Sequence, residues 1–126
     1  MTASSGPARP SAQRAPYRRG DVVLVPFPFT ERLAEKQRPA VVVSTEAYYA
    51  AGNDLIIAQI TSRTNPPPRP GDHLLGGWRE AGLPLPSLVR ARVTTIHTSR
   101  VRRLLGTLTS HDLASVDMGL RSALGV

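Results

Sequence analysis

The sequence predicts a mainly β protein: a small barrel of five to seven short strands, with a short helix after the second strand and a longer C-terminal helix. Three observations support this. Short runs of β-branched and apolar residues recur, each with the length of a strand. Glycines, prolines and polar residues separate these runs. Only one segment, near the C-terminus, repeats its apolar residues at helical spacing.

Length and composition place the chain among single-domain proteins. Its 126 residues suffice for one hydrophobic core, and the absence of cysteine excludes disulfides and thiolate metal sites. No apolar run approaches the roughly 18–20 residues of a membrane span, and the first residues lack an apolar signal-peptide core. We therefore expect a cytoplasmic protein that does not enter a membrane.

The net charge of +7 is unevenly distributed, because residues 1–19 carry four arginines and no acidic residue. We expect residues 1–17 to form a disordered basic tail and residues 18–126 to form the folded domain. The domain is only mildly basic, which permits a polyanionic partner without requiring one.

The first two strands are predicted at residues 22–25 and 40–43, where valines predominate. Proline cannot donate to a sheet ladder, so the chain should leave the sheet at Pro26 and re-enter near Pro39. Connections this long are uncommon unless they are functional or disordered. Arg38 lies at the base of this loop, where strand geometry would hold its guanidinium firmly.

The next elements are a short helix and a third strand. Ser44 or Thr45 can cap a helix over residues 46–51. A buried strand at residues 55–60 then runs into a polar cluster at residues 61–64. Polar residues directly after a buried strand are common at functional sites and equally common where ordinary strands end.

The middle of the chain is rich in proline and glycine. Residues 65–72 form a stiff proline-rich loop, residues 73–75 a brief strand, and residues 76–82 are too glycine-rich for a helix. Trp78 is expected to bury its ring as a plug, in preference to serving as a platform for base stacking.

Three more strands and a helix complete the chain. The strands are expected at residues 87–91, 93–98 and 104–108, with Arg90 and Arg92 on one face. Thr109 and Asp112 have the spacing of a capping box. The terminal helix that they begin carries one apolar stripe, formed by Leu113, Val116, Leu120 and Leu124.

Few residues suggest chemistry on their own. The three histidines, His73, His97 and His111, are not paired with carboxylates at metal-ligand spacing, and no phosphate-binding glycine loop is present. What remains is a set of arginines and hydroxyls that can donate to a phosphate: Arg38, Thr61, Ser62, Arg63, Arg90 and Arg92. From composition alone, the better explanation is that Arg38 is a surface residue and that Thr61 is an ordinary strand end.

The order of several motifs resembles the PemK/MazF toxins. GDVVLVPFPFT, QRPAVVVS, NDLIIAQITS, WREAGLPLPSLVR and the LTSHDL start of the terminal helix follow one another at compatible spacing from Gly20 to the C-terminus. The resemblance implies an SH3-like barrel of the CcdB/PemK type. It also implies a toxin of a type II toxin–antitoxin system, working as a metal-independent, cofactor-free, sequence-specific endoribonuclease on single-stranded RNA. Such enzymes use the RNA 2′-OH as nucleophile and leave a 2′,3′-cyclic phosphate and a 5′-OH.

The resemblance also implies roles and partners. Arg38 of the Arg-Pro step and Thr61 after the third strand would be catalytic. The RNA-binding residues would be Phe29, Thr30, Glu31, Lys36, Ser62, Arg63, Arg90 and Arg92. Some relatives carry an acidic base where this chain has Arg92, so Glu31 or Glu35 would have to replace it, or Arg38 and Thr61 would act alone. A homodimer and a cognate antitoxin are the implied protein partners.

Two other functions fit the same barrel. A CcdB-like toxin would inhibit gyrase, but such toxins rely on a C-terminal end containing an aromatic residue, and this chain ends in Ala123-Leu124-Gly125-Val126. A non-catalytic nucleic-acid-binding module would normally display several aromatic stacking platforms, whereas aromatic residues make up only 5% here.

Overall fold

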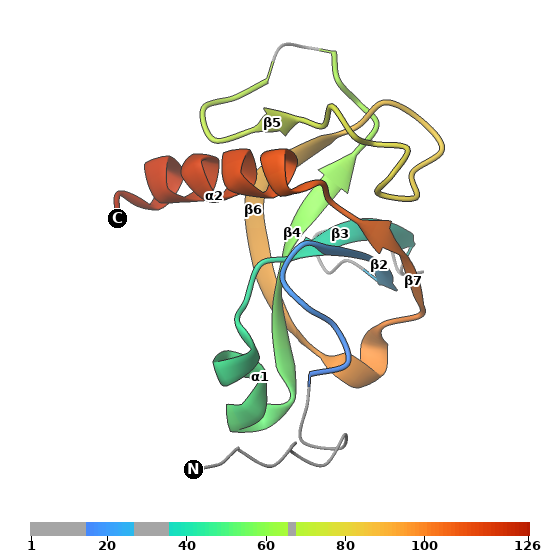
Figure 1. The fold of residues 1–126 in the computed structure, drawn as a ribbon, viewed down its shortest axis with the longest axis vertical. Coiled ribbons are helices and arrows are strands. Elements are labelled where there is room, and N and C mark those ends of the chain that lie inside the picture. Colours follow the sequence, from blue (N-terminus) through green and yellow to red (C-terminus); the bar gives the residue numbers. More distant parts are fainter. Residues whose placement is uncertain (1–14, 27–35, 66–67) are drawn as a thin grey trace.

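The fold is one curled antiparallel sheet with two helices, as the mainly β prediction required (Figure 1). The computed structural model describes residues 15–26, 36–65 and 68–126. Its six strands have the order β5-β6-β4-β3-β2-β7. The elements are β2 (Asp21–Pro26), β3 (Gln37–Val42), α1 (Glu46–Gly52), β4 (Asp54–Thr61), β5 (His73–Leu74), β6 (Leu88–His97), the 3₁₀ turn η2 (Thr98–Arg100), β7 (Arg103–Thr107) and α2 (Ser110–Leu124).

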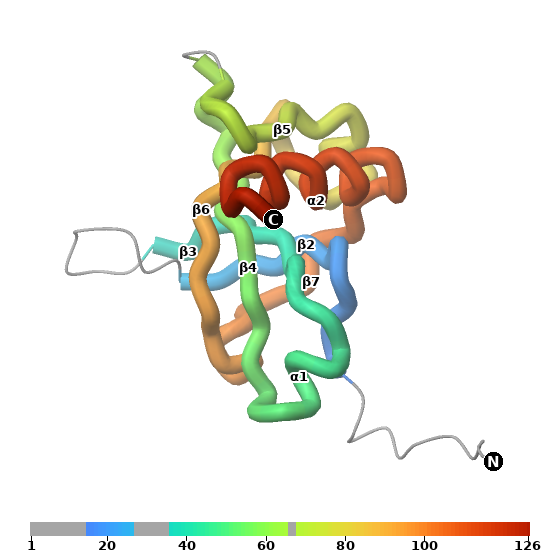
Figure 2. Tube along the Cα trace, turned by 90° about the vertical axis from the view of Figure 1, so that its left-hand side faces the viewer, coloured from blue at the N-terminus to red at the C-terminus, as the bar shows by residue number. Residues whose placement is uncertain are grey.

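The helices lie toward opposite ends of the long strands β4 and β6 (Figures 1 and 2). Thr45, one of the two predicted caps, begins α1 by accepting a hydrogen bond from the N–H of Tyr48. The alternative, Ser44, is buried and accepts from the N–H of Ile56 at 3.0 Å. At the other end, Asn53 adopts a left-handed conformation with φ of 61° and donates to the carbonyl of Tyr49.

The chain leaves the sheet after Pro26 and re-enters it near Pro39, as predicted, but two strand boundaries differ from the prediction. The second strand was expected from residue 40 and begins at Gln37, so that Pro39 itself pairs with Leu24 of β2. The two strands expected at residues 87–91 and 93–98 are one ten-residue strand, β6. The strand continues because it follows β4 along its whole length and absorbs its arginines in a bulge rather than ending at them.

Apolar side chains form two clusters, which face opposite sides of the sheet because neighbouring strand residues alternate. Val22, Val41 and Ile60 belong to the cluster beneath α2, with Val116 of that helix. Val23, Val42 and Ile57 belong to the other, against which Tyr17, Tyr49 and Val101 pack. The strands β2, β3, β4 and β6 therefore each contribute to both cores.

The C-terminal helix begins as predicted and buries less than predicted. Thr109 caps α2 by accepting from the N–H of Asp112. Val116 is buried, and Leu113 and Leu120 pack against the first core cluster. Leu124 was expected in the same stripe but is 66% exposed, because the C-terminal end of α2 projects past the sheet (Figure 1).

The ring of Trp78 packs against the first core cluster, as predicted. The guanidinium of Arg79 lies over this ring, 4.4 Å from the ring centroid. Residues 1–14 of the predicted tail lie outside the described residues. Within the ranges that are described, no helix is long and apolar enough to cross a membrane.

Candidate functional site

A proline ends the ladder between β3 and β4. The N–H of Val43 donates to the carbonyl of Ile56 in β4 at 2.9 Å. Backbone N–H groups of a strand point alternately to its two neighbours, so the nitrogens of Val41 and Pro39 also point toward β4. The register that pairs Ala40 with Gln59 would require a donor from Pro39 next, and proline has none. The pairing accordingly stops at Ala40, and the two strands are not paired beyond it.

A cleft of about 820 Å³ lies where this pairing stops. The same register, continued by two residues, puts Arg38 opposite Thr61, and both side chains line this cleft. The other lining residues are Leu24, Lys36, Pro39, Gln59, Ile60, Ser62, Arg63, Gly82, Leu83, Pro84, Leu85, Ser87, Arg103 and Leu105. The guanidinium of Arg38, near the start of β3, and the hydroxyl of Thr61, at the end of β4, thus share the first cleft.

Both side chains can donate to a ligand. The hydroxyl oxygen of Thr61 accepts from the N–H of Arg63 at 3.1 Å, which leaves the hydroxyl hydrogen available as a donor. Arg38 is exposed, and its guanidinium makes no hydrogen bond or ion pair with any residue that the structure describes. The fork of a guanidinium matches two oxygens of a phosphate or carboxylate.

A second cleft of about 630 Å³ continues from the first. It shares Gln59, Thr61 and Arg63 with the first cleft, and Arg69, Pro70, Asp72, Arg90, Ala91 and Arg92 complete its lining. Three residues of β6, at 90–92, face the single residue Gln59 of β4, because Ala58 pairs with Val93 and Ile60 with Val89. This bulge displaces β6 where Arg90 and Arg92 enter the cleft.

Arg90 is held in place by a buried carboxylate. Its Nη1 lies 3.1 Å from Oδ2 of Asp72, whose side chain is only 3% exposed. The same oxygen accepts from the N–H of Arg69 at 2.8 Å. Asp72 therefore fixes both Arg90 and the loop that precedes β5, and it sets one side of the second cleft.

The charge of the two clefts favours an extended anion. Lys36, Arg38, Arg63 and Arg103 line the first, without an acidic residue among its described lining. The second holds four arginines and one carboxylate, which Arg90 already neutralises in part. Walls of one charge sign raise the local concentration of oppositely charged ligands.

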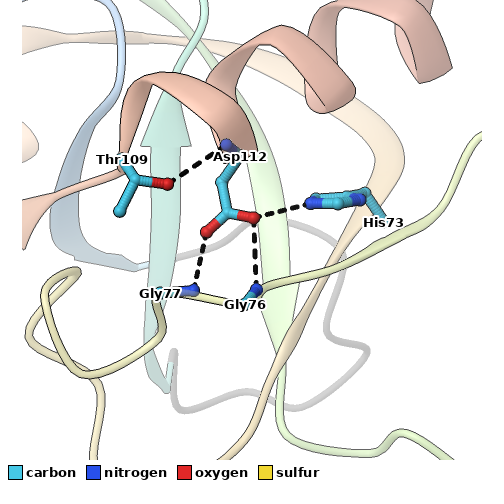
Figure 3. A network of polar contacts seen from close by, with 5 residues as sticks. All are labelled: His73, Gly76, Gly77, Thr109 and Asp112. Atoms are coloured by element: carbon cyan, nitrogen blue, oxygen red, sulfur yellow. Dashed lines mark hydrogen bonds and ion pairs between the residues drawn. The ribbon is translucent and has the colours of Figure 1, made fainter.

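The wall segment, residues 76–85, is held at its start by a buried carboxylate (Figure 3). Its later residues, at 82–85, line the first cleft. Asp112, in the first turn of α2, accepts from the N–H groups of Gly76 and Gly77 at 3.1 and 2.8 Å. Its Oδ1 also lies 2.8 Å from Nε2 of His73. Burial raises the pKa of Asp112, but the bonds from His73, Gly77, Gly76 and Thr109 outweigh burial and hold that pKa below its ordinary value.

This segment also packs backbone to backbone against β7. Gly82 has a φ of +77°, and a Cβ added there would overlap the carbonyl oxygen of Leu105. A Cβ added at Gly106 would lie 2.5 Å from the carbonyl carbon of Ala81. Only glycine permits this approach, which sets the position of Leu83 and Leu85 in the wall.

The structure brings most of the predicted site residues together. Arg38, Lys36 and Ser62 line the first cleft, Arg90 and Arg92 the second, and Thr61 and Arg63 both. The predicted Phe29, Thr30 and Glu31, and the alternative base Glu35, lie outside the described residues. Within the described ranges, no group of three or more histidine, aspartate or glutamate residues could hold a metal ion.

Sequence reasoning missed Gln59 and Arg103 as lining residues. Gln59 was read only as part of a buried strand, although a polar residue within the apolar run 55–60 was a usable signal. Arg103 is far from the other lining residues in sequence, and only the pairing of β7 with β2 at Leu24 brings it to the cleft. The role of His73 as a partner of Asp112 was likewise invisible in the spacing.

Several solved structures share this fold. A crystal structure of MazF from Deinococcus radiodurans matches with a TM-score of 0.68 and 26% identity, covering 87% of this chain and 97% of that one. A MazE–MazF structure from the same organism gives a TM-score of 0.69 and 25% identity over the same shares. An endoribonuclease in complex with its cognate antitoxin, from a mycobacterial species, gives 0.69 with 22% identity, 87% of this chain and 96% of that one, which shows the fold alone.

No curated protein sequence matches the chain. A family model does match, from residue 18 to residue 124, and therefore covers nearly all of the structure just described. The chain belongs to the family of PemK-like, MazF-like toxins of type II toxin–antitoxin systems.

Proposed function

We propose that this protein is a metal-independent endoribonuclease that cleaves single-stranded RNA at specific sequences, with Arg38 and Thr61 as its catalytic residues. The observation that carries the proposal is their position: opposite each other in the continued β3–β4 register and in one cationic cleft. The MazF structures and the mycobacterial endoribonuclease on the same fold support the reaction class.

The proposed reaction is an internal transesterification. The 2′-oxygen of the RNA attacks the adjacent phosphorus, a 2′-O–P bond forms and the P–O5′ bond breaks. Solvent water accepts the proton from the 2′-hydroxyl and supplies a proton to the 5′-oxygen. The guanidinium of Arg38 donates to the oxygens on which negative charge develops, which stabilises the transition state more than the ground state. Thr61 holds the scissile phosphate through its hydroxyl hydrogen.

The second cleft is proposed to bind the RNA backbone beside the cleavage site. Arg63 lies in both clefts and Arg90 is fixed by Asp72, so phosphates on either side of the scissile bond meet positioned cations. Single strands expose the base edges that sequence-specific recognition requires. The cytoplasm is the proposed location, since RNA is the proposed substrate.

Two protein partners accompany the proposal. The complexes of MazE with MazF and of the mycobacterial endoribonuclease with its antitoxin support a cognate antitoxin for this chain. A disordered, acidic segment of that antitoxin would complement the cationic clefts. We also propose a homodimer, which would cover edge strands such as β7, where Leu104 is 51% exposed.

The test is to incubate the protein with unstructured RNA in EDTA and to determine the chemistry of the new ends. The proposal predicts 2′,3′-cyclic phosphate and 5′-OH ends at one recurring sequence. Cleavage that EDTA abolishes, or 5′-phosphate ends, contradicts the mechanism. Gyrase inhibition without RNA cleavage would indicate a CcdB-like toxin, and salt-dependent binding without any product would indicate a non-catalytic module.

A further inference from the structure

Gln59 lies at the junction of the two clefts. It lines both, together with Thr61 and Arg63. Its side chain lies on the same face of the sheet as that of Thr61, two residues further along β4. Its partner in β3 is the small residue Ala40. Arg38 is diagonally opposite in the same register, within reach of a long side chain. Three side chains, an amide, a guanidinium and a hydroxyl, thus converge on one space.

The amide oxygen of Gln59 is buried and lacks a hydrogen-bond donor among the described residues. Its exposed area is below 1 Å². A buried acceptor without a donor is rare, because it has lost its hydrogen bond to water without gaining another. Among the described side chains this oxygen is the only such atom. A residue that binds no ligand would be more stable here with an apolar side chain, like that of Ile57 on the same face of β4.

We infer that the amide oxygen of Gln59 accepts a hydrogen bond from the ribonucleotide bound between Arg38 and Thr61, and that Gln59 is a substrate-contacting residue of this site. Arg38 and Arg63, the cations that line the clefts beside Gln59, are proposed to bind phosphates, so we assign the missing donor to the ligand. The inference rests on the proposed function, since it takes the ligand to be RNA.

Two groups of a ribonucleotide could supply this hydrogen bond: the 2′-hydroxyl and an exocyclic base amine. In the first case the amide oxygen orients the hydroxyl so that a lone pair of the 2′-oxygen faces phosphorus. In the second it selects bases that carry an amine. In both cases the amide oxygen of Gln59 is the acceptor. The two cases differ in whether removing the base amine from the substrate abolishes the effect of mutating Gln59.

The first experiment uses the protein without RNA and compares Gln59→Met with the wild type. Methionine keeps the length of glutamine and removes the orphan acceptor, so Tm should rise by about 3–6 °C. Gln37→Met is the matched control, because Gln37 is exposed on β3 and lines neither cleft, and its Tm should equal that of the wild type. A lower Tm for Gln59→Met would show that the oxygen already has a partner in the protein and would overturn the inference.

The second experiment measures kcat/KM on an oligonucleotide that contains the mapped cleavage site. Gln59→Met should lower kcat/KM about 10-fold although it stabilises the fold, which no purely structural role would produce. The measurement is repeated with an amine-free base beside the scissile bond, such as inosine for guanosine. A persisting 10-fold loss assigns the bond to the 2′-hydroxyl, and a vanishing loss assigns it to the base amine.

The outcomes separate the inference from the proposed function. If the wild type cleaves RNA and Gln59→Met cleaves it equally well, the inference is wrong and the proposed function stands. If the wild type does not cleave RNA under any condition tested, both are wrong.

Discussion

The carboxylate of Asp112 and the imidazole of His73, 39 residues apart in sequence, meet at 2.8 Å between Oδ1 and Nε2 (Figure 3). The same carboxylate accepts from the N–H groups of Gly76 and Gly77. Asp112 thereby connects α2 to β5 and to the wall segment, residues 76–85, which lines the first cleft. The C-terminal helix thus supports the cleft, although it contributes no lining residue.

This network predicts a loss of stability in acid that depends on Asp112. Its pKa is lowered by folding, so its contribution is complete above the unfolded-state pKa of about 3.9 and is lost as the pH falls through the lowered folded-state pKa. Asp112→Asn should cost about 2–3 kcal/mol at pH 7. Thermal unfolding from pH 7 to pH 2 should show a smaller acid-dependent fall in Tm for Asp112→Asn than for the wild type. Parallel curves would show that the carboxylate is not the titrating group.

The glycine contact between β7 and the wall segment predicts a steric effect. Gly106→Ala places a Cβ 2.5 Å from the carbonyl carbon of Ala81 and should lower the free energy of unfolding by about 1–3 kcal/mol. Gly52→Ala is the control: a Cβ there meets nothing within 4 Å, and alanine favours the helix, so stability should stay equal or rise slightly. Urea unfolding of the two variants measures the difference. Equal free energies would mean that the wall segment moves away from β7 without cost.

The cationic clefts predict a salt dependence that specific arginines set. Binding of an uncleavable 2′-O-methyl RNA should weaken with salt, and the slope of log K against log salt should fall by about 0.7 for each phosphate contact removed. Arg63→Gln, in both clefts, should reduce the slope by that amount. Arg121→Gln, on α2 outside both clefts, should leave the slope unchanged. Equal slopes for the two variants would rule out the clefts as the RNA path.

Local residue patterns predicted the elements better than their extent. The valine runs, the cap at Thr109 and the strand over residues 55–60 were readable because each depends on neighbouring residues. The start of β3 was not readable because it depends on pairing with β2, and the continuity of β6 was not because it depends on pairing with β4. Pro39 illustrates the difference. Its missing N–H is evident from the sequence, but the sequence does not show that the pairing it interrupts is the one with β4.

In the site too, single residues were predictable from the sequence, whereas the contacts between them were not. Arg38 and Thr61 were predicted through family resemblance; both line the first cleft, and the β3–β4 register, if continued by two residues, would put them opposite each other. The partners of Asp72 and Asp112 could not be predicted, because Arg90 and His73 reach them only through the folded arrangement of β5 and β6. The orphan oxygen of Gln59 is likewise a property of packing, since the same glutamine on an exposed strand would bond to water.

The most direct measurement is the single-turnover rate of RNA cleavage in EDTA for Arg38→Ala and Thr61→Val, with Thr61→Ser as the control that keeps the hydroxyl. Arg38 is exposed and Thr61→Val keeps the shape of the side chain, so Tm should change little in either variant. The account predicts that both rates fall about 10²–10³-fold and that Thr61→Ser retains most of the wild-type rate. Wild-type rates in both Arg38→Ala and Thr61→Val would contradict it.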